Sequence, residues 1–98
     1  MLEPHVTEAL NLLQEECAET IVVISKIRRF GIDTPYIKDN NFNQTSESKR
    51  DSLHQEIGDV LLLVDLLVEY NLLDKEKLNN AKQLKREKLK KYSNLPNL

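Results

Sequence analysis

The sequence has little cysteine, glycine and proline, and tryptophan is absent. Its one cysteine, Cys17, allows no internal disulfide and no multi-cysteine zinc site. Two glycines and three prolines in 98 residues exclude a collagenous or low-complexity chain. A hydrophobic share of 40% beside a charged share of 31% is typical of a small, helix-rich domain. We therefore expect residues 1–98 to form one domain, stabilised by helix packing or oligomerisation.

Long apolar runs and targeting signals are also lacking. The longest apolar-rich run, residues 60–68, is too short to span a bilayer and contains Asp65. The first ten residues have no basic region followed by an apolar one, so no signal peptide is expected. Together with the single cysteine, these features predict a cytoplasmic protein without a membrane partner.

The charges are unevenly distributed along the chain. Residues 1–70 carry 13 acidic and 6 basic residues, a net charge of −7, whereas residues 71–98 carry 3 acidic and 8 basic residues, a net charge of +5. A basic segment of this kind suits nucleic acid, but it equally suits an acidic surface of the same protein. The other features of the sequence favour the second interpretation, and we expect no nucleic-acid partner.

Hydrophobic periodicity predicts an all-α protein with one long connection. The sequence predicts motif helices over about 5–30 and 51–70, a polar loop over 31–50 and a basic helix over about 74–92. Apolar residues of the first helix recur at three- and four-residue steps, and Cys17 falls on this stripe, so we expect it in the core. Asp51 or Ser52 is able to cap the second helix.

The second predicted helix is apolar on nearly every side, which is enough to bury two faces. In so short a chain this implies a partner subunit. We therefore expect a helical hairpin plus a third basic helix. A homodimer or homotetramer would complete this arrangement as a core of the four-helix-bundle type.

Two pairs of acidic residues at three-residue spacing point to a metal site. Glu16 and Glu19 share a face of the first helix, and Glu56 and Asp59 repeat the spacing on the second. Packed antiparallel, the two helices would gather four carboxylates, which are costly to bury without a cation. Such oxygen ligands suit Mg²⁺ or Mn²⁺. Spacing alone leaves two alternatives open, because the acids are also suited to solvent or to pairing with the basic third helix.

Three segments resemble a known enzyme family. They read L-Q-E-E-C-A-E over 13–19, S-K-I-R-R-F-G over 25–31 and L-H-Q-E-I-G-D-V over 53–60. In this order, at the spacing of a helical hairpin, they resemble the motifs of small, single-domain MazG-like nucleoside triphosphate pyrophosphohydrolases. The resemblance extends over roughly residues 8–90. It implies an all-α domain that hydrolyses a nucleoside triphosphate to the monophosphate and pyrophosphate with Mg²⁺.

The resemblance also assigns roles to the acidic residues. The metal ligands of the family correspond to Glu16, Glu19, Glu56 and Asp59, and Glu15 completes the candidate catalytic set beside them. Mg²⁺ neutralises phosphate oxygens and lowers the pKa of a bound water, while a neighbouring carboxylate accepts the proton. Glu15 and the ligands themselves all stay candidates for that base.

Basic and amide residues supply the candidate substrate contacts. Members of the family use side chains of the third helix to bind the triphosphate, and two cations near the end of the first helix are also suitable. The candidates are Lys26, Arg29, Asn79, Lys82, Lys85 and Arg86. Solvated lysines and complementation of a helix dipole are the alternatives for these cations. Tyr36 and Phe42 are aromatic residues of the loop, suited either to stacking on a base or to anchoring the loop.

These features predict a Mg²⁺-dependent pyrophosphohydrolase of (deoxy)nucleoside triphosphates that removes unwanted nucleotides, with deoxynucleotides weakly favoured. Two alternatives remain. One is a phosphoribosyl-ATP pyrophosphohydrolase, against which the R-F-G segment and the long polar loop argue mildly. The other is a non-catalytic dimeric interaction module, against which the clustered acids argue, because a scaffold gains nothing from them.

Overall fold

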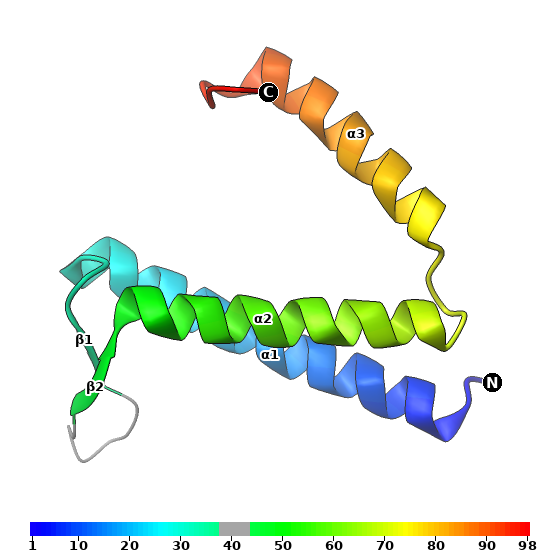
Figure 1. The fold of residues 1–98 in the computed structure, drawn as a ribbon, viewed down its shortest axis with the longest axis horizontal. Coiled ribbons are helices and arrows are strands. Elements are labelled where there is room, and N and C mark those ends of the chain that lie inside the picture. The colour runs from blue at the N-terminus through cyan, green and yellow to red at the C-terminus, as the bar shows by residue number, and fades with distance from the viewer. Residues whose placement is uncertain (38–43) are drawn as a thin grey trace.

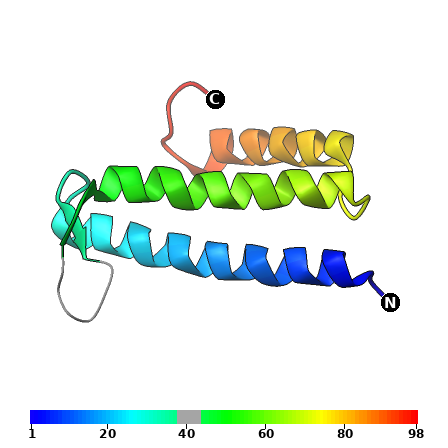
Figure 2. The same cartoon turned by 60° about the horizontal axis from the view of Figure 1, so that its bottom comes forward.

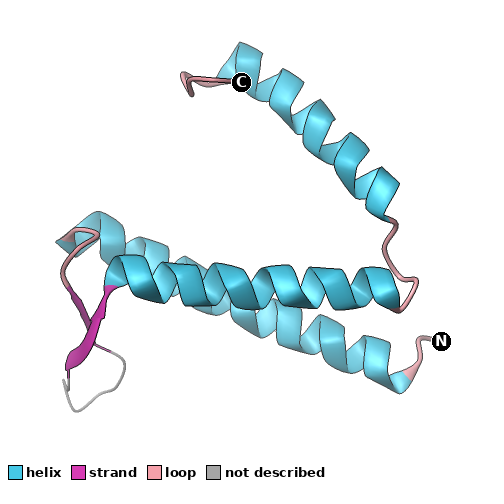
Figure 3. Ribbon diagram, viewed as in Figure 1, coloured by secondary structure: helices cyan, strands magenta, loops and turns pink. Residues whose placement is uncertain are grey.

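The computed structural model describes residues 1–37 and 44–98, with the backbone alone for 35–37 and 44–47. In chain order the elements are α1 (Pro4–Phe30), β1 (Pro35–Ile37), β2 (Gln44–Ser48), α2 (Lys49–Glu69) and α3 (Lys75–Tyr92) (Figure 1). Three helices dominate the structure, which confirms the predicted all-α class (Figure 3). In the described part of the chain, no helix combines the length and the apolar character needed to cross a membrane.

Helices α1 and α2 form a hairpin and lie side by side in both views (Figures 1 and 2). Val6 and Ala9 of α1 pack with Leu67 of α2, and Val23 and Leu63 are buried as well. Burying a large apolar side chain contributes about 1.5–3 kcal/mol. Partly buried residues surround this cluster, namely Leu10, Leu13, Tyr70 and Leu73. The hairpin therefore holds the small apolar core of the described structure.

The buried face of α1 differs from the predicted stripe in its second half. Cys17, expected in the core, is exposed, and Ile21 is 68% exposed. The buried residues there are Thr20 and Val23. The physical reason is that α1 carries two apolar faces, and α2 covers only the face that contains Glu16. Periodicity detects both faces without ranking them.

Helix α2 begins at Lys49, two residues earlier than predicted. Ser48 is its N-cap: the side chain accepts a hydrogen bond from the backbone N–H of Asp51 at 3.2 Å, and the Asp51 carboxylate accepts one from the Ser48 N–H at 3.3 Å. The prediction of Asp51 or Ser52 as the cap is therefore wrong. Asp51 is the third residue of a reciprocal capping box, where its carboxylate bonds back to the N-cap N–H, although aspartate is also a preferred N-cap residue.

The connection predicted as a loop contains a small antiparallel strand pair, in which Pro35 lies opposite Ser48. Strand β1 has only three residues, too few for an alternating pattern to reveal it. Arg50 donates hydrogen bonds to Asp33 at 2.9 and 3.3 Å, and the buried Lys49 donates one to the Thr34 hydroxyl. These contacts fix the connection to the first turn of α2.

Helix α3 diverges from the hairpin after Asp74, which caps it by accepting a hydrogen bond from the Lys77 N–H at 2.9 Å (Figure 1). None of its residues is buried. The radius of gyration is 16.6 Å, whereas a compact chain of this length would have about 13 Å. The splayed position of α3 leaves apolar side chains uncovered, including Leu61 at 58% and Leu84 at 66% exposure.

Candidate metal centre

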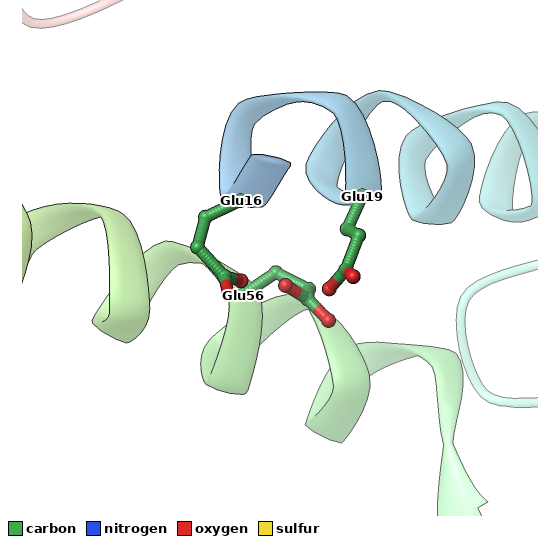
Figure 4. A group of neighbouring side chains, drawn as sticks. All are labelled: Glu16, Glu19 and Glu56. Atoms are coloured by element: carbon green, nitrogen blue, oxygen red, sulfur yellow. The ribbon is translucent and has the colours of Figure 1, made fainter. Parts of the chain in front are cut away.

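The carboxylates of Glu16, Glu19 and Glu56 converge between α1 and α2 (Figure 4). One oxygen from each of the three lies within 4.8 Å of the others. Glu16 and Glu19 are one turn apart on α1, so their side chains project from the same face. Glu56 reaches them from α2. The cluster therefore forms only in the closed hairpin, and it combines three of the four ligands that the sequence predicts.

Two of these carboxylates carry oxygens that are shielded and unpartnered. Within the described part of the chain, Oε2 of Glu16 and Oε2 of Glu56 are shielded from solvent and have no hydrogen-bond partner. Glu19, by contrast, is exposed. A buried polar atom without a partner costs about 1–3 kcal/mol, and a charged one costs more. The shielded carboxylates of Glu16 and Glu56 would therefore be stabilised by a bound cation or a proton.

The pKa of Glu56 reflects the same shielding. It is raised from 4.5 to about 7, first by burial of the carboxyl group and then by the neighbouring Glu16 carboxylate and the charge of Glu19. Without a cation, Glu56 is therefore partly protonated near neutral pH, because like charges held close together disfavour ionisation. A divalent cation would replace that proton, since metal ligands bind in their deprotonated form. Oxygen donors of this kind fit Mg²⁺ or Mn²⁺.

Asp59 and Glu15 lie outside the converging group. Both side chains are exposed, and neither belongs to the set of described carboxylates that approach one another within 4.8 Å. Successive residues of a helix differ by about 100° in direction, which turns Glu15 away from its neighbour Glu16. Asp59 follows Glu56 by three residues and stays on the adjacent part of the same face. Its carboxylate is not one of the three that converge.

The two candidate cations of α1, Lys26 and Arg29, differ in position. Lys26 follows Glu19 by seven residues, about two helical turns, and therefore shares its face. Arg29 lies further round the helix, with its guanidinium carbon 5.1 Å from the centre of the Phe30 ring. Arg29 also lines a groove on the exposed side of α1 with Ile21. Of the two, Lys26 is the one on the carboxylate side.

The basic and amide candidates of α3 are not brought to the carboxylates within one chain. These candidates are Asn79, Lys82, Lys85 and Arg86. The first three line a groove between α2 and α3 together with Asp65. Asp65 follows Glu56 by nine residues, about two and a half turns, and so lies on the opposite side of α2. Any contact of these α3 residues with the cluster requires a second copy or a movement of α3.

Sequence reasoning missed two buried polar residues at the start of α2. Ser52 and Lys49 are only 3% and 4% exposed. They precede Glu56 by four and seven residues, so all three share one face of the helix. That spacing was a usable signal, but a predicted helix start at residue 51 leaves Lys49 outside the helix.

The two aromatic residues of the loop cannot be compared with their predicted roles, because Phe42 and the side chain of Tyr36 lie outside the described residues.

Comparisons with protein-family models, with curated proteins and with solved structures found no match to this chain. Membership of the MazG-like family therefore stays a prediction based on the three motifs.

Proposed function

We propose that this chain is a Mg²⁺-dependent pyrophosphohydrolase that converts (deoxy)nucleoside triphosphates to monophosphates and pyrophosphate, with deoxynucleotides weakly favoured. The observation that carries the proposal is the convergence of Glu16, Glu19 and Glu56 with shielded, unpartnered oxygens. Mg²⁺ characteristically binds to a few carboxylates and completes its coordination with water and substrate phosphates. A partly open carboxylate cluster between two helices suits that mode of binding.

In the proposed reaction, Mg²⁺ and the side chains of the chain have different roles. Held by Glu16, Glu19 and Glu56, with Asp59 beside them, Mg²⁺ would neutralise phosphate oxygens and lower the pKa of a bound water. Water attacks the α-phosphorus, the bond to the bridging oxygen of the β-phosphate breaks, and pyrophosphate leaves. The proton of the attacking water passes to a carboxylate, for which Glu15 and the ligands themselves are the candidates.

We also propose that the working form is a homodimer or homotetramer. Leu53, Ile57 and Leu61 follow one another at four-residue steps on a face of α2 that α1 does not cover, and Ile57 and Leu61 are exposed. A second copy that covers this stripe would bury it. The basic α3 of one copy would then face the acidic hairpin of the other, and Lys82 and Arg86 would bind phosphate oxygens there. This arrangement accounts for the charge asymmetry without a nucleic-acid partner.

The uncovered stripe of α2 also favours a second candidate function, a non-catalytic interaction module. Such a protein would use the stripe for pairing and α3 for an acidic partner. It would have no use for the unpartnered carboxylate oxygens at the centre of the hairpin. The two candidates differ in metal binding, because only the hydrolase requires Mg²⁺.

A substrate screen tests the proposal. Purified protein with Mg²⁺ is incubated with each standard NTP and dNTP, and with phosphoribosyl-ATP, and the products are separated by ion exchange. Monophosphate plus pyrophosphate supports the proposal, and the rates give the base and sugar preference. Diphosphate plus orthophosphate contradicts it. Turnover of phosphoribosyl-ATP alone would favour that related substrate, and absence of both turnover and metal binding would leave the interaction module.

Glu16→Gln is the inactive control for this screen, because it removes one converging carboxylate. Glu8→Gln is its matched active control. Glu8 is an exposed glutamate of the same helix, two turns before Glu16 and outside the cluster. Activity that survives in Glu16→Gln would come from a contaminating enzyme or from another site.

A further inference from the structure

Apart from the carboxylates, the Ser52 hydroxyl is an unusual polar group of the hairpin. Ser52 is 3% exposed, and its Oγ is shielded from solvent without a hydrogen-bond partner in the described part of the chain. Buried hydroxyls are normally hydrogen-bonded, because losing water without replacement is costly. An exception of this kind calls for a group that the hydroxyl would bind in the functional state.

A second buried hydroxyl, that of Thr20, has the hydrogen bond that such a group normally makes. Thr20 donates a hydrogen bond to the main-chain carbonyl of Glu16, four residues earlier, at 2.7 Å. Serine and threonine within helices commonly make this bond. Ser52 does not make it, so its proton stays available inside the interface between α1 and α2.

An unpartnered acceptor on the same face of α2 belongs to Glu56. Ser52 and Glu56 are four residues apart, so their side chains are neighbours on the helix surface. Side chains of a helix lean toward its N-terminus, which places the Glu56 carboxylate over the turn that carries Ser52. Oε2 of Glu56 is shielded and unpartnered in the same way as the serine oxygen. A donor and an acceptor thus lie next to each other, each without a partner.

We propose that Ser52 is a positioning residue for Glu56, donating its hydroxyl proton to the Glu56 carboxylate oxygen that does not bind the metal. The inference rests on the proposed function, because it takes Glu56 as a metal ligand. A ligating carboxylate keeps its orientation through hydrogen bonds to its other oxygen, and losing such a partner typically lowers metal affinity about 10- to 100-fold.

The test uses Mn²⁺ as the probe and the full chain, with affinity measured by isothermal titration calorimetry. Ser52→Ala is expected to bind Mn²⁺ about 10-fold more weakly than the wild type, since the donor is lost. Ser52→Thr keeps the hydroxyl and is expected to restore most of the affinity. Ser25→Ala is the matched control, because Ser25 is an exposed serine nine residues after Glu16, on the opposite side of α1.

A second readout separates positioning from packing. Without metal, Ser52→Ala should melt at the wild-type temperature or above it, because it removes a buried hydroxyl that has no partner. Wild-type Mn²⁺ affinity in Ser52→Ala would overturn the inference and leave the proposed function standing. Weak Mn²⁺ binding by both Ser52→Ala and Ser52→Thr, together with lowered melting temperatures, would also overturn the inference and leave the proposed function standing. Absence of Mn²⁺ binding by the wild type would overturn both.

Discussion

At the scale of single residues, the chemistry of the hairpin depends on how three carboxylates share a confined space. The Glu56 carboxyl meets the Glu16 and Glu19 carboxylates across the helix pair, and burial together with these two neighbours raises the pKa of Glu56 to about 7. If apolar residues stood in place of these carboxylates, the stability of the helix pair would not depend on pH through their ionisation. The acidic cluster thus makes the stability of the metal-free protein depend on pH.

Without metal, the protein should become less stable as the pH rises from 5 to 8. The pKa of Glu56 is about 7 in the folded chain against an ordinary 4.5, so the folded state binds more protons over this interval. The stabilisation is fully present below pH 4.5 and is lost as the pH rises through 7. Allowing for solvent screening, we expect a loss of about 1–2 kcal/mol. Thermal melts in chelator, as a function of pH, measure it.

Two variants test the origin of this pH dependence: Glu56→Gln removes the titrating group, and Glu8→Gln is the control that removes a carboxylate elsewhere on the hairpin. Glu56→Gln should flatten the pH dependence, whereas Glu8→Gln should keep it, because Glu8 is exposed and has no part in the cluster. A wild-type melting temperature that rises over the same interval would have the wrong sign for a carboxyl group with a raised pKa.

Glu16→Gln and Asp59→Asn should both abolish hydrolysis but differ in their effect on the metal-free fold. Glu16 is half-buried among like charges, so its neutralisation should raise the melting temperature in chelator. Asp59 is exposed and outside the converging group, so its neutralisation should leave that temperature unchanged. Pyrophosphate release and melting curves with and without Mg²⁺ are the measurements. Full activity in either variant would contradict the assigned ligand set.

At the scale of elements, the start of α2 fixes the position of the cluster. The capping box of Ser48 and Asp51 stabilises the helix turn that precedes Ser52 and Glu56. Ser48→Ala should cost about 1 kcal/mol, the usual value of a lost N-cap. For a domain of this size that is a decrease of about 4–8 °C in melting temperature. Ser48→Asp, which restores a capping acceptor, should recover it, and equal melting of all three proteins would mean that the cap contributes nothing.

The same elements indicate how far the sequence predicts the structure. The convergence of Glu16 with Glu56 follows from helical spacing and an antiparallel hairpin, both of which are local rules. The exposure of Cys17 does not follow, because α1 has two apolar faces and only the packing of α2 selects one. The cap was misassigned because Asp51 suits two positions of the same motif. The burial of Ser52 was missed, although its four-residue spacing from Glu56 places both residues on one face of the helix.

At the scale of the whole molecule, the chain is more extended than its length requires. Its radius of gyration is 16.6 Å, and its principal extents are 41, 40 and 17 Å. No local pattern predicts the direction that α3 takes after Asn71, which adopts a left-handed conformation with φ of 61°. The position of α3 leaves the Leu53–Leu61 stripe of α2 without a cover from its own chain. Such apolar surface on a small protein typically marks an interface.

Leu61→Glu should therefore dissociate the proposed oligomer without unfolding the chain. Leu61 is 58% exposed in the single chain, so a charge there costs little in a monomer but is expensive in a buried interface. Leu95→Glu is the matched control, because Leu95 is also 58% exposed but lies in the C-terminal segment outside the stripe. Sedimentation velocity measures the outcome, and Asp65→Asn, in the groove beside the stripe, should shift assembly in a milder way.

The activity of the Leu61→Glu protein tests whether the carboxylate site requires the oligomer. If α3 of one copy supplies phosphate contacts to the hairpin of another, the dissociated variant should keep its Mn²⁺ affinity, because Glu16, Glu19 and Glu56 come from one chain. It should lose turnover, because Lys82 lies on the far side of α2 from those carboxylates. A fully active monomer would mean that α3 closes over its own hairpin. A wild-type protein that sediments at the 11.4 kDa of one chain would exclude the oligomer itself.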